Sequence, residues 1–338
     1  MKIKIAVLMP NNATRDSFIT PKVMSELEKL GDVVYNKENY SLPAITKLLN
    51  NANICVTGWG CPSINTEVLT DAKQLRLVAH TGGSVASIVS PALYERGITV
   101  ISGNELYAES VAEGTIAYIL AGLRRISYYD NNMQKGGWRP GSFDNKGLLD
   151  RSVGLVGFGA VTRHLVPLLK AFRVKVMVCC KYLSDEDCQK YGMIRTESME
   201  QLFSSCDIVS LHLARTRETY HAIDKNLLSL MPDGALFINT ARGSIVDEQA
   251  LADELSKGRI HAVLDVFEEE PLPTDSRLRG LDNVILIPHM AGPTGDRHEY
   301  ISMALVEDMR RMLAGQPLVH TIEQSLAMRM TNDALKFI

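Results

Sequence analysis

The sequence predicts an α/β protein built from two parallel sheets, each with helices on both faces, in two lobes with a cleft between them. Three observations support this fold class. Strand-like apolar runs alternate with helical patterns along nearly the whole chain, as expected where helices connect parallel strands. These runs form two separate series, the second beginning near Val153. The length of 338 residues also suits two domains.

The first series predicts a five-stranded lobe. Its first helix has clear ends, because Thr20 is a good N-cap, Pro21 suits the first helical position and Gly31 suits the position after the last turn. The apolar side chains Val23, Leu27 and Leu30 share one face of this helix. The expected strands are 3–9, 32–36, 52–59, 75–82 and 97–102.

The second series predicts a six-stranded sheet that begins with a glycine turn, which is the pattern of a Rossmann sheet. The whole chain is therefore expected to form two Rossmann-like, doubly wound parallel-sheet lobes. One helix between these strands has Asp247 as its expected N-cap and Gly258 as its stop. The expected strands are 152–158, 174–180, 207–213, 235–241, 260–267 and 284–290.

Two long helices and one loop connect and complete the lobes. Residues 104–126 read as a single helix, followed by a loop over 132–147 that is rich in Gly and Asn. The last long helix is expected at about 296–314. Its apolar face would contain Ile301, Leu305, Met309, Met312 and Leu313. We expect a nucleotide lobe over 104–294 and a substrate lobe over 1–103, completed by 295–338.

The glycine turn is the first stretch that indicates chemistry. Gly157 permits a tight turn after a strand, and Gly159 lets a helix N-terminus approach a pyrophosphate. Thr162 stands where a third glycine would complete G-x-G-x-x-G. That glycine serves helix–strand packing, so threonine there is expected to cost about 1 kcal/mol in packing rather than in binding. A purely structural turn is the alternative, and the turn alone does not decide between them.

Three further polar residues follow expected strand ends, where open α/β sheets bind ligands. Arg242 offers a planar fork of donors for a carboxylate, although an isolated arginine is more often part of a surface ion pair. Glu270 directly precedes a proline, whereas Glu268 and Glu269 fit a solvated turn. His289 follows a strand end and a proline, where a lone histidine is more often structural than catalytic.

Together these stretches resemble the D-isomer-specific 2-hydroxyacid dehydrogenase family over nearly the whole chain. The residues that carry the resemblance are "VGLVGFGAV", "INTARGSIVDEQAL", "LDVFEEEP" and "PHMAG". The resemblance implies that Arg242 binds substrate, that His289 exchanges a proton with it, and that Glu270 orients the histidine. It also implies that Asp265 and Thr240 contact the nicotinamide carboxamide.

The resemblance implies further binding residues. The glycine fingerprint assigns cofactor binding to Gly157, Gly159, Ala160 and Val161. The loop "HTGGSV" stands where the family binds substrate carboxylate through backbone amides, which assigns Gly82, Gly83 and Ser84; the usual Gly-x-Asp-x-Ile continuation is absent. No acid follows the second strand of the nucleotide lobe at Cys180, and Lys181 comes next. We therefore expect NAD or NADP as cofactor, with NADPH accepted and by a small margin preferred, because Lys181 could pair with a 2′-phosphate. Two alternatives stay open: Lys181 points to solvent and the backbone alone holds the ribose, or Asp185 and Glu186 reach back to the ribose and restore a preference for NAD.

The expected function is reversible hydride transfer between NAD(P)H and a small 2-keto or D-2-hydroxy acid. Formate dehydrogenase of the same fold is one alternative, but the family's formate enzymes resemble this arrangement with glutamine in place of the glutamate, so Glu270 disfavours it. A nucleotide-sensing, non-catalytic scaffold of the corepressor kind is another. Retention of Arg242, Glu270 and His289 favours catalysis over a scaffold.

The composition of the chain excludes several classes of binding partner. A net charge of −3 gives no basic field for nucleic acid, and no apolar run is long enough to span a membrane. No histidine or cysteine spacing indicates a metal site. The six cysteines fit reduced thiols in a cytoplasmic protein. By resemblance, a homodimer is expected through the segment 123–140.

Overall fold

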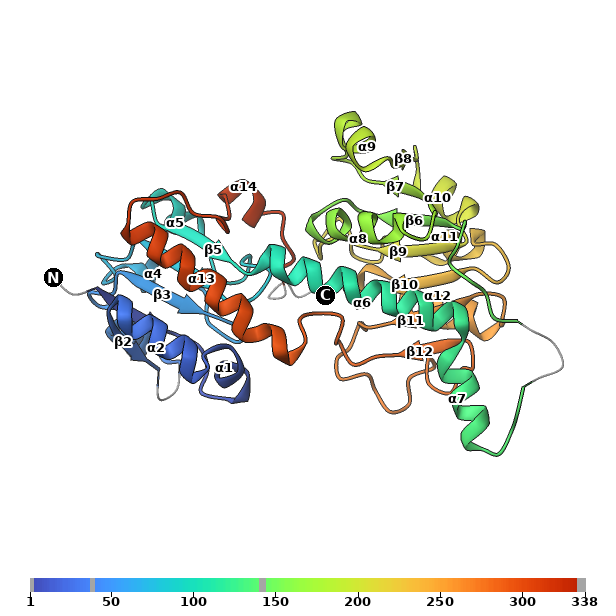
Figure 1. The fold of residues 1–338 in the computed structure, drawn as a ribbon, viewed down its shortest axis with the longest axis horizontal. Helices are drawn as coiled ribbons and strands as arrows, with labels where there is room; N and C mark the ends of the chain where they lie inside the picture. Colours follow the sequence, from blue (N-terminus) through green and yellow to red (C-terminus); the bar gives the residue numbers. More distant parts are fainter. Residues whose placement is uncertain (1–2, 37–39, 140–143, 333–338) are drawn as a thin grey trace. The chain divides into compact units, whose positions relative to one another are not determined.

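The computed structural model describes residues 3–36, 40–139 and 144–332. These residues form two compact units, which we describe one at a time (Figure 1). The first unit comprises the described residues up to Tyr107 and those from Pro293 to Asn332, and the second comprises Ala108–Gly292. The C-terminal segment thus returns to the unit in which the chain begins.

The first unit contains a five-stranded sheet in which all strands run parallel, in the order β2-β1-β3-β4-β5. All five expected strands are confirmed. β1 lies between β2 and β3, with Ile5 opposite both Val33 and Ile54. The carboxyl ends of the strands therefore lie along one edge of the sheet. The strands are β1 (Lys4–Val7), β2 (Asp32–Tyr35), β3 (Ile54–Thr57), β4 (Leu77–His80) and β5 (Thr99–Ser102).

Helices cover both faces of this sheet. One face is buried by α3, α4 and α5, and the other by α2 and α13. The predicted ends of α2 are confirmed, since the Thr20 hydroxyl accepts a hydrogen bond from the Val23 amide and Gly31 follows the last turn. The helices are α1 (Ala13–Phe18), α2 (Pro21–Leu30), α3 (Leu42–Leu49), α4 (Thr66–Leu69), α5 (Pro91–Glu95), α13 (His298–Leu313) and α14 (Gln324–Ala327).

The helix α13 completes the core of the first unit with Ile301, Leu305 and Met309. Leu313 was predicted on the same buried face, and this is wrong: its side chain is exposed. Leu313 is the last residue of the helix, where the chain leaves the apolar face of the sheet. A short 3-10 helix, η2 (Gly295–Arg297), leads into α13.

The second unit contains a seven-stranded, fully parallel sheet in the order β12-β11-β10-β9-β6-β7-β8. The six predicted strands are confirmed, and the two-residue edge strand β8 is an addition. The order of the strands reverses between β6 and β9, which makes this the topological switch point. The strands are β6 (Ser152–Val156), β7 (Lys175–Cys179), β8 (Ile194–Arg195), β9 (Ile208–Leu211), β10 (Leu236–Asn239), β11 (His261–Leu264) and β12 (Val284–Leu286).

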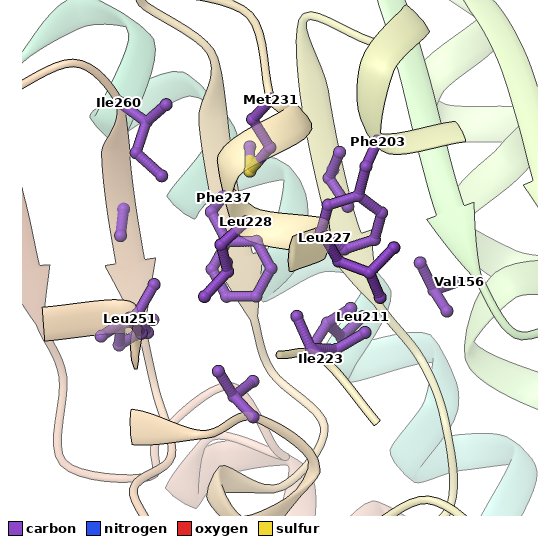
Figure 2. Packing of buried hydrophobic residues seen from close by; sticks show 14 of the residues in the cluster. Val156, Phe203, Leu211, Ile223, Leu227, Leu228, Met231, Phe237, Leu251 and Ile260 are labelled. Carbon is purple, nitrogen blue, oxygen red and sulfur yellow. The ribbon is translucent and has the colours of Figure 1, made fainter. Parts of the chain in front are cut away.

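Two apolar clusters, one on each face, bury the second sheet. Figure 2 shows part of one cluster, in which Phe203, Leu227 and Leu251 from the covering helices pack near Phe237 of β10. The helices are α6 (Asn104–Arg124), α7 (Ile126–Gln134), α8 (Ala160–Lys170), α9 (Asp185–Tyr191), α10 (Met199–Ser205), α11 (Lys225–Leu230) and α12 (Glu248–Ser256), with the 3-10 turn η1 (Gly243–Ile245). The predicted cap of α12 is confirmed, because Asp247 accepts from the Ala250 amide.

The expected single helix over 104–126 is wrong at its end. Arg125 adopts a left-handed conformation with φ of +52°, which ends α6 and starts the separate helix α7. The guanidinium of Arg125 lies over the Tyr128 ring and pairs with Asp144. These contacts hold the chain at the break. Part of the expected loop, Pro140–Phe143, lies outside the described residues.

Candidate active site

The glycine turn joins β6 to α8 at the switch point of the second sheet. Gly157 has a φ of +103°, and a Cβ atom at this position would lie 2.6 Å from the carbonyl oxygen of His212. Glycine is required here for two reasons: the positive φ, and the close approach of His212, the residue that follows β9. The amide of Gly157 donates to the carbonyl oxygen of Cys179 over 2.9 Å. This turn is therefore fixed by the sheet beneath it.

The next glycine leaves room for a ligand. Gly159 is the N-cap of α8, and a Cβ atom there would meet no atom within 4 Å. Ala160 and Val161 follow in the first turn, where helix amides and the helix dipole favour an anion. The space and the donors fit the pyrophosphate of a dinucleotide, so the residues present suit such a cofactor.

Thr162 is part of this turn as well as of the helix. Its side chain is fully buried, and its hydroxyl donates to the carbonyl oxygen of Gly157 over 3.1 Å. The threonine thus ties the first turn of α8 to the glycine that precedes the helix. Sequence reasoning considered only its volume and did not find this bond.

The second strand of the sheet ends at Cys179, and the two residues expected to meet the ribose follow it. Cys180 is half-buried, while Lys181 is exposed with its Nζ atom 5.7 Å from the centre of the Tyr182 ring. The nearest acid on the following helix, Asp185, forms an exposed ion pair with Arg195 at 3.1 Å. Among the described residues, a lysine and no acid stand directly after this strand, and the acids Asp185 and Glu186 begin the following helix.

Two predicted residues meet as an ion pair beyond β11 and β12. The Nδ1 atom of His289 donates to Oε2 of Glu270 over 2.7 Å, and Oε1 of Glu270 accepts from the Phe267 amide over 3.0 Å. The side chains of His289 and Glu270 are 45% and 37% exposed, so a ligand can reach them. They line a cavity of about 540 Å³ together with Phe267.

The contact between His289 and Glu270 shifts the pKa of each side chain. The hydrogen bond to Glu270 raises the pKa of His289, although burial and the nearby Arg242 act in the opposite direction. Burial favours the neutral form of Glu270, but the bonds from His289 and Phe267 and the positive charges of His289 and Arg242 leave its pKa below the ordinary value. The arrangement thus favours a protonated imidazole with Nε2 left as its outer donor.

Arg242 lies close enough to influence both members of the pair. It follows β10, and its Nη1 atom donates to the carbonyl oxygen of Ala241 over 2.7 Å. The structure therefore brings together the three residues predicted as catalytic, from the carboxyl ends of three neighbouring strands. A guanidinium beside an imidazolium suits a carboxylate and a developing oxyanion.

A buried carboxylate holds the turn that carries His289. Asp265 is 1% exposed, and its oxygens accept from the amides of Met290, over 2.7 Å, and Ala291, over 3.0 and 3.1 Å. The amide of His289 donates to the carbonyl oxygen of Asp265 over 2.8 Å. These bonds stabilise His289 in a left-handed conformation with φ of +54°, which costs a non-glycine residue about 1–3 kcal/mol.

Sequence reasoning missed one polar contact here. The hydroxyl of Tyr118, in α6, donates to Oδ1 of Asp265 over 3.2 Å. A tyrosine within the apolar stretch "TIAYIL" was the available signal, because a half-buried hydroxyl needs a partner. Thr240 is also paired, with its hydroxyl 3.2 Å from that of Thr115. Both expected carboxamide contacts, Asp265 and Thr240, therefore adjoin residues of α6.

The predicted substrate loop belongs to the first unit. Gly82, Gly83 and Ser84 follow β4, and within the described ranges no residue accepts a hydrogen bond from their three backbone amides. The Ser84 hydroxyl donates to the carbonyl oxygen of Thr331, and the Ser102 hydroxyl donates to that of Gly83. A fixed loop whose successive amides find no acceptor among the described residues suits an anion.

The seven-stranded parallel sheet, with its glycine turn at the switch point, defines a dinucleotide-binding domain of the Rossmann type. The chain belongs to the D-isomer specific 2-hydroxyacid dehydrogenase family, whose NAD binding domain it matches over residues 116–291.

The relatives agree with this assignment. The chain is 32% identical to D-3-phosphoglycerate dehydrogenase of Archaeoglobus fulgidus over 260 residues, which is 77% of this chain and 49% of that protein. The chain thus spans about half the length of the phosphoglycerate dehydrogenases it matches. It is 29% identical to hydroxypyruvate reductase of Thermotoga maritima, over 82% of this chain and 90% of that one. A solved acyclic imino acid reductase, Bsp5, in complex with NADPH and D-Arg, has a TM-score of 0.77 at 26% identity, covering 95% of this chain and all of that one.

The described part of the chain has two further properties. None of its helices has the length and apolar character needed to cross a membrane. Among the same residues, no group of three or more His, Cys, Asp and Glu side chains is arranged to hold a metal ion.

Proposed function

We propose that this chain reduces a small 2-keto acid to a D-2-hydroxy acid with NADH or NADPH, reversibly. The observation that carries the proposal is the hydrogen-bonded pair of His289 and Glu270, beside Arg242, at the carboxyl edge of a dinucleotide-binding sheet. Such an edge is where α/β sheets bind ligands. A histidine with a raised pKa is a proton donor for the keto oxygen near neutral pH.

Each protein group has a separate task in this proposal. His289 holds the proton at Nε2 and gives it to the keto oxygen, and takes it back in the oxidative direction. Glu270 orients the ring through Nδ1 and favours its charged form. Arg242 binds the substrate and stabilises negative charge on the same oxygen. A bound nicotinamide supplies the hydride.

Binding is assigned to the loops described above. Gly157, Gly159, Ala160 and Val161 would hold the pyrophosphate at the start of α8, as their open space and helix amides support. Asp265 and Thr240 would adjoin the carboxamide. The amides of the loop Gly82–Ser84 would bind the substrate carboxylate, supported by their lack of acceptors among the described residues.

The test is oxidation of NADH and NADPH in the presence of a panel of 2-keto acids, with wild type and His289→Gln. We expect turnover with at least one keto acid, and a loss of about 10²–10⁴-fold in kcat in the variant while cofactor affinity is unchanged. Tight cofactor binding with no turnover of any keto acid would point to a non-catalytic, nucleotide-sensing scaffold. Reduction of NAD by formate would point to formate dehydrogenase.

We also propose a two-fold dimer that buries α7. Two large apolar side chains on this helix support the proposal, since Ile126 is 56% and Met133 48% exposed. Light scattering at micromolar concentration should give twice the chain mass, and Ile126→Asp should give the single mass.

We also propose that the protein acts in the cytoplasm. The six unpaired cysteines support this reducing location.

A further inference from the structure

Four rings pack together in the first unit, beside the loop Gly82–Ser84; we call them the aromatic cluster (Phe18, Trp59, Tyr107 and His298). The indole of Trp59 makes edge-to-face contacts with the other three rings, at 5.7 Å from Phe18, 5.7 Å from Tyr107 and 6.4 Å from His298. Phe18 and His298 stack at 4.1 Å. The indole is thus held from three sides.

The indole is nevertheless open to solvent on its remaining side. Trp59 follows β3 and is 49% exposed, whereas Phe18 beneath it is 1% exposed. An exposed indole ordinarily keeps rotamer freedom, whereas contacts with three neighbouring rings restrict this one. A fixed, exposed aromatic surface at the carboxyl edge of a parallel sheet binds an apolar ligand with little further entropic cost.

The cluster touches the loop that is assigned to the substrate carboxylate. A Cβ atom at Gly82 would lie 2.5 Å from Nε2 of His80 and 3.2 Å from Nε1 of Trp59. A Cβ atom at Gly83 would lie 3.5 Å from the Tyr107 side chain. The loop therefore runs against an imidazole, an indole and a phenol.

None of these three side chains offers a positive charge. His80 is 2% exposed, its Nδ1 lies 3.0 Å from the Thr57 hydroxyl, and burial lowers its pKa to about 4. Burial also lowers the pKa of His298. A phosphate or a second carboxylate on the substrate would be bound by arginine or lysine. These neutral rings fit an uncharged aromatic group instead.

One buried polar atom in the cluster has no partner among the described residues. The hydroxyl of Tyr107 is buried and makes no hydrogen bond with the described residues. A buried hydroxyl without a partner is rare in native proteins and calls for an explanation such as a ligand or a water molecule. It is a second polar group of the first unit, after the loop amides, that has no partner among the described residues.

We propose that the aromatic cluster binds the side chain of the substrate, and that the substrate is a 2-keto acid with an uncharged aromatic group, of the phenylpyruvate class. This inference rests on the proposed function, because it assumes that the loop binds the substrate carboxylate. The proposed substrate differs from the phosphorylated substrate for which D-3-phosphoglycerate dehydrogenase is named. Trp59 is the specificity-determining residue.

Steady-state kinetics test this assignment with phenylpyruvate, pyruvate, hydroxypyruvate and phosphohydroxypyruvate. We expect kcat/KM for phenylpyruvate to exceed that for pyruvate at least about tenfold, with the phosphorylated acid the poorest substrate. In Trp59→Ala the ratio of phenylpyruvate to pyruvate should fall at least about tenfold, since the ring contact is lost. A preference for the phosphorylated acid, or an unchanged ratio, overturns the inference while the proposed function stands. No turnover of any keto acid overturns the proposed function itself.

A second measurement does not depend on turnover. The chain has two tryptophans, Trp59 and Trp138, and Trp138 belongs to the second unit. In Trp138→Phe the fluorescence therefore comes from Trp59 alone. Phenylpyruvate should quench it with a saturating dependence, and pyruvate should quench it far less. Trp59→Phe, which leaves only Trp138, is the control for absorption of light by the ligand. Equal quenching of both variants would overturn the assignment, whether or not Trp59→Ala folds.

Discussion

The Nδ1 atom of His289 donates to Oε2 of Glu270 over 2.7 Å, and that contact raises the pKa of the histidine. Under the proposed function, reduction needs protonated His289, so its rate should fall as pH rises through this pKa. Oxidation needs the neutral ring and should rise through the same pKa. We therefore predict that the pair sets the pH at which each direction runs.

Replacing the carboxylate should move both profiles. In Glu270→Gln the largest cause of the raised pKa is gone, so the pKa of His289 falls, and both midpoints should move to lower pH by about one unit. The measurement is kcat/KM against pH in each direction. Glu268→Gln is the matched control, because Glu268 pairs with His221 instead. Coincident profiles for wild type and Glu270→Gln would contradict the pairing.

Asp265→Asn tests how the turn of His289 is held. Asparagine has one acceptor oxygen where the carboxylate has two, and its NH₂ group would face the amides of Met290 or Ala291. We expect kcat to fall about 10–100-fold because His289 is misplaced. The pKa of His289 should also fall, since the Asp265 charge helps to raise it.

Tyr118→Phe is the milder companion change, since it removes one bond to Asp265 and leaves the two backbone amides bound. It should lower kcat less than Asp265→Asn does. A loss of thermal stability in Asp265→Asn with kcat and the pH profile unchanged would show that the carboxylate serves only the fold.

Arg242→Lys tests the planar fork of donors. Lysine keeps the positive charge but offers no bidentate geometry. We expect KM for the keto acid to rise and kcat to fall, together lowering kcat/KM about 10²-fold, while KM for the cofactor stays constant. Lysine at this position with normal keto-acid kinetics would exclude the proposed substrate contact.

Thr162→Val tests the hydrogen bond at the start of α8. Valine fills the same volume, so the change removes only the hydroxyl and leaves the carbonyl oxygen of Gly157 without this donor. We expect a loss of about 1–2 kcal/mol in the free energy of unfolding, measured with urea. Thr162→Ser keeps the hydroxyl and is the control for that bond. If Thr162→Val is as stable as wild type, the hydroxyl contributes nothing and the role of residue 162 is packing alone.

The strands, and the positions of Arg242, Glu270 and His289 after strand ends, could be predicted from local pattern, whereas their catalytic roles came from the family resemblance and stay a prediction. Apolar runs marked eleven of the twelve strands, and β8 was missed because two exposed residues carry no periodicity. Arg242, Glu270 and His289 follow strand ends, and parallel strands bring such ends to one edge. The end of α6 was mispredicted, since the left-handed turn at Arg125 depends on its contacts with Tyr128 and Asp144.

Contacts between distant segments were not accessible. The bond from Tyr118 to Asp265 joins residues 147 positions apart, and the aromatic cluster joins Phe18 and Trp59 to His298. Each of these side chains is unremarkable in its own segment. The family resemblance assigned binding of the substrate carboxylate to the backbone amides at 82–84. The local sequence pattern does not predict which rings lie against these amides.

We predict that the residues after β7 determine the choice of cofactor. A site specific for NAD carries an acid after this strand, where it bonds the ribose 2′-hydroxyl and repels a 2′-phosphate. Here Cys180 and Lys181 follow the strand, and Asp185 is engaged by Arg195 at 3.1 Å. The exposed Lys181 ammonium is available to a 2′-phosphate. We therefore predict that NADPH is used, with a small preference over NADH.

In Lys181→Ala, KM for NADPH should rise about tenfold while KM for NADH stays within about twofold, since only NADPH carries the phosphate that the ammonium would pair with. The difference should shrink as salt concentration rises. Lys190→Ala is the matched control, because Lys190 also lies near a tyrosine ring but on the far end of α9. A strong wild-type preference for NADH that Lys181→Ala does not alter would show that this lysine points away from the cofactor and that other groups bind the ribose.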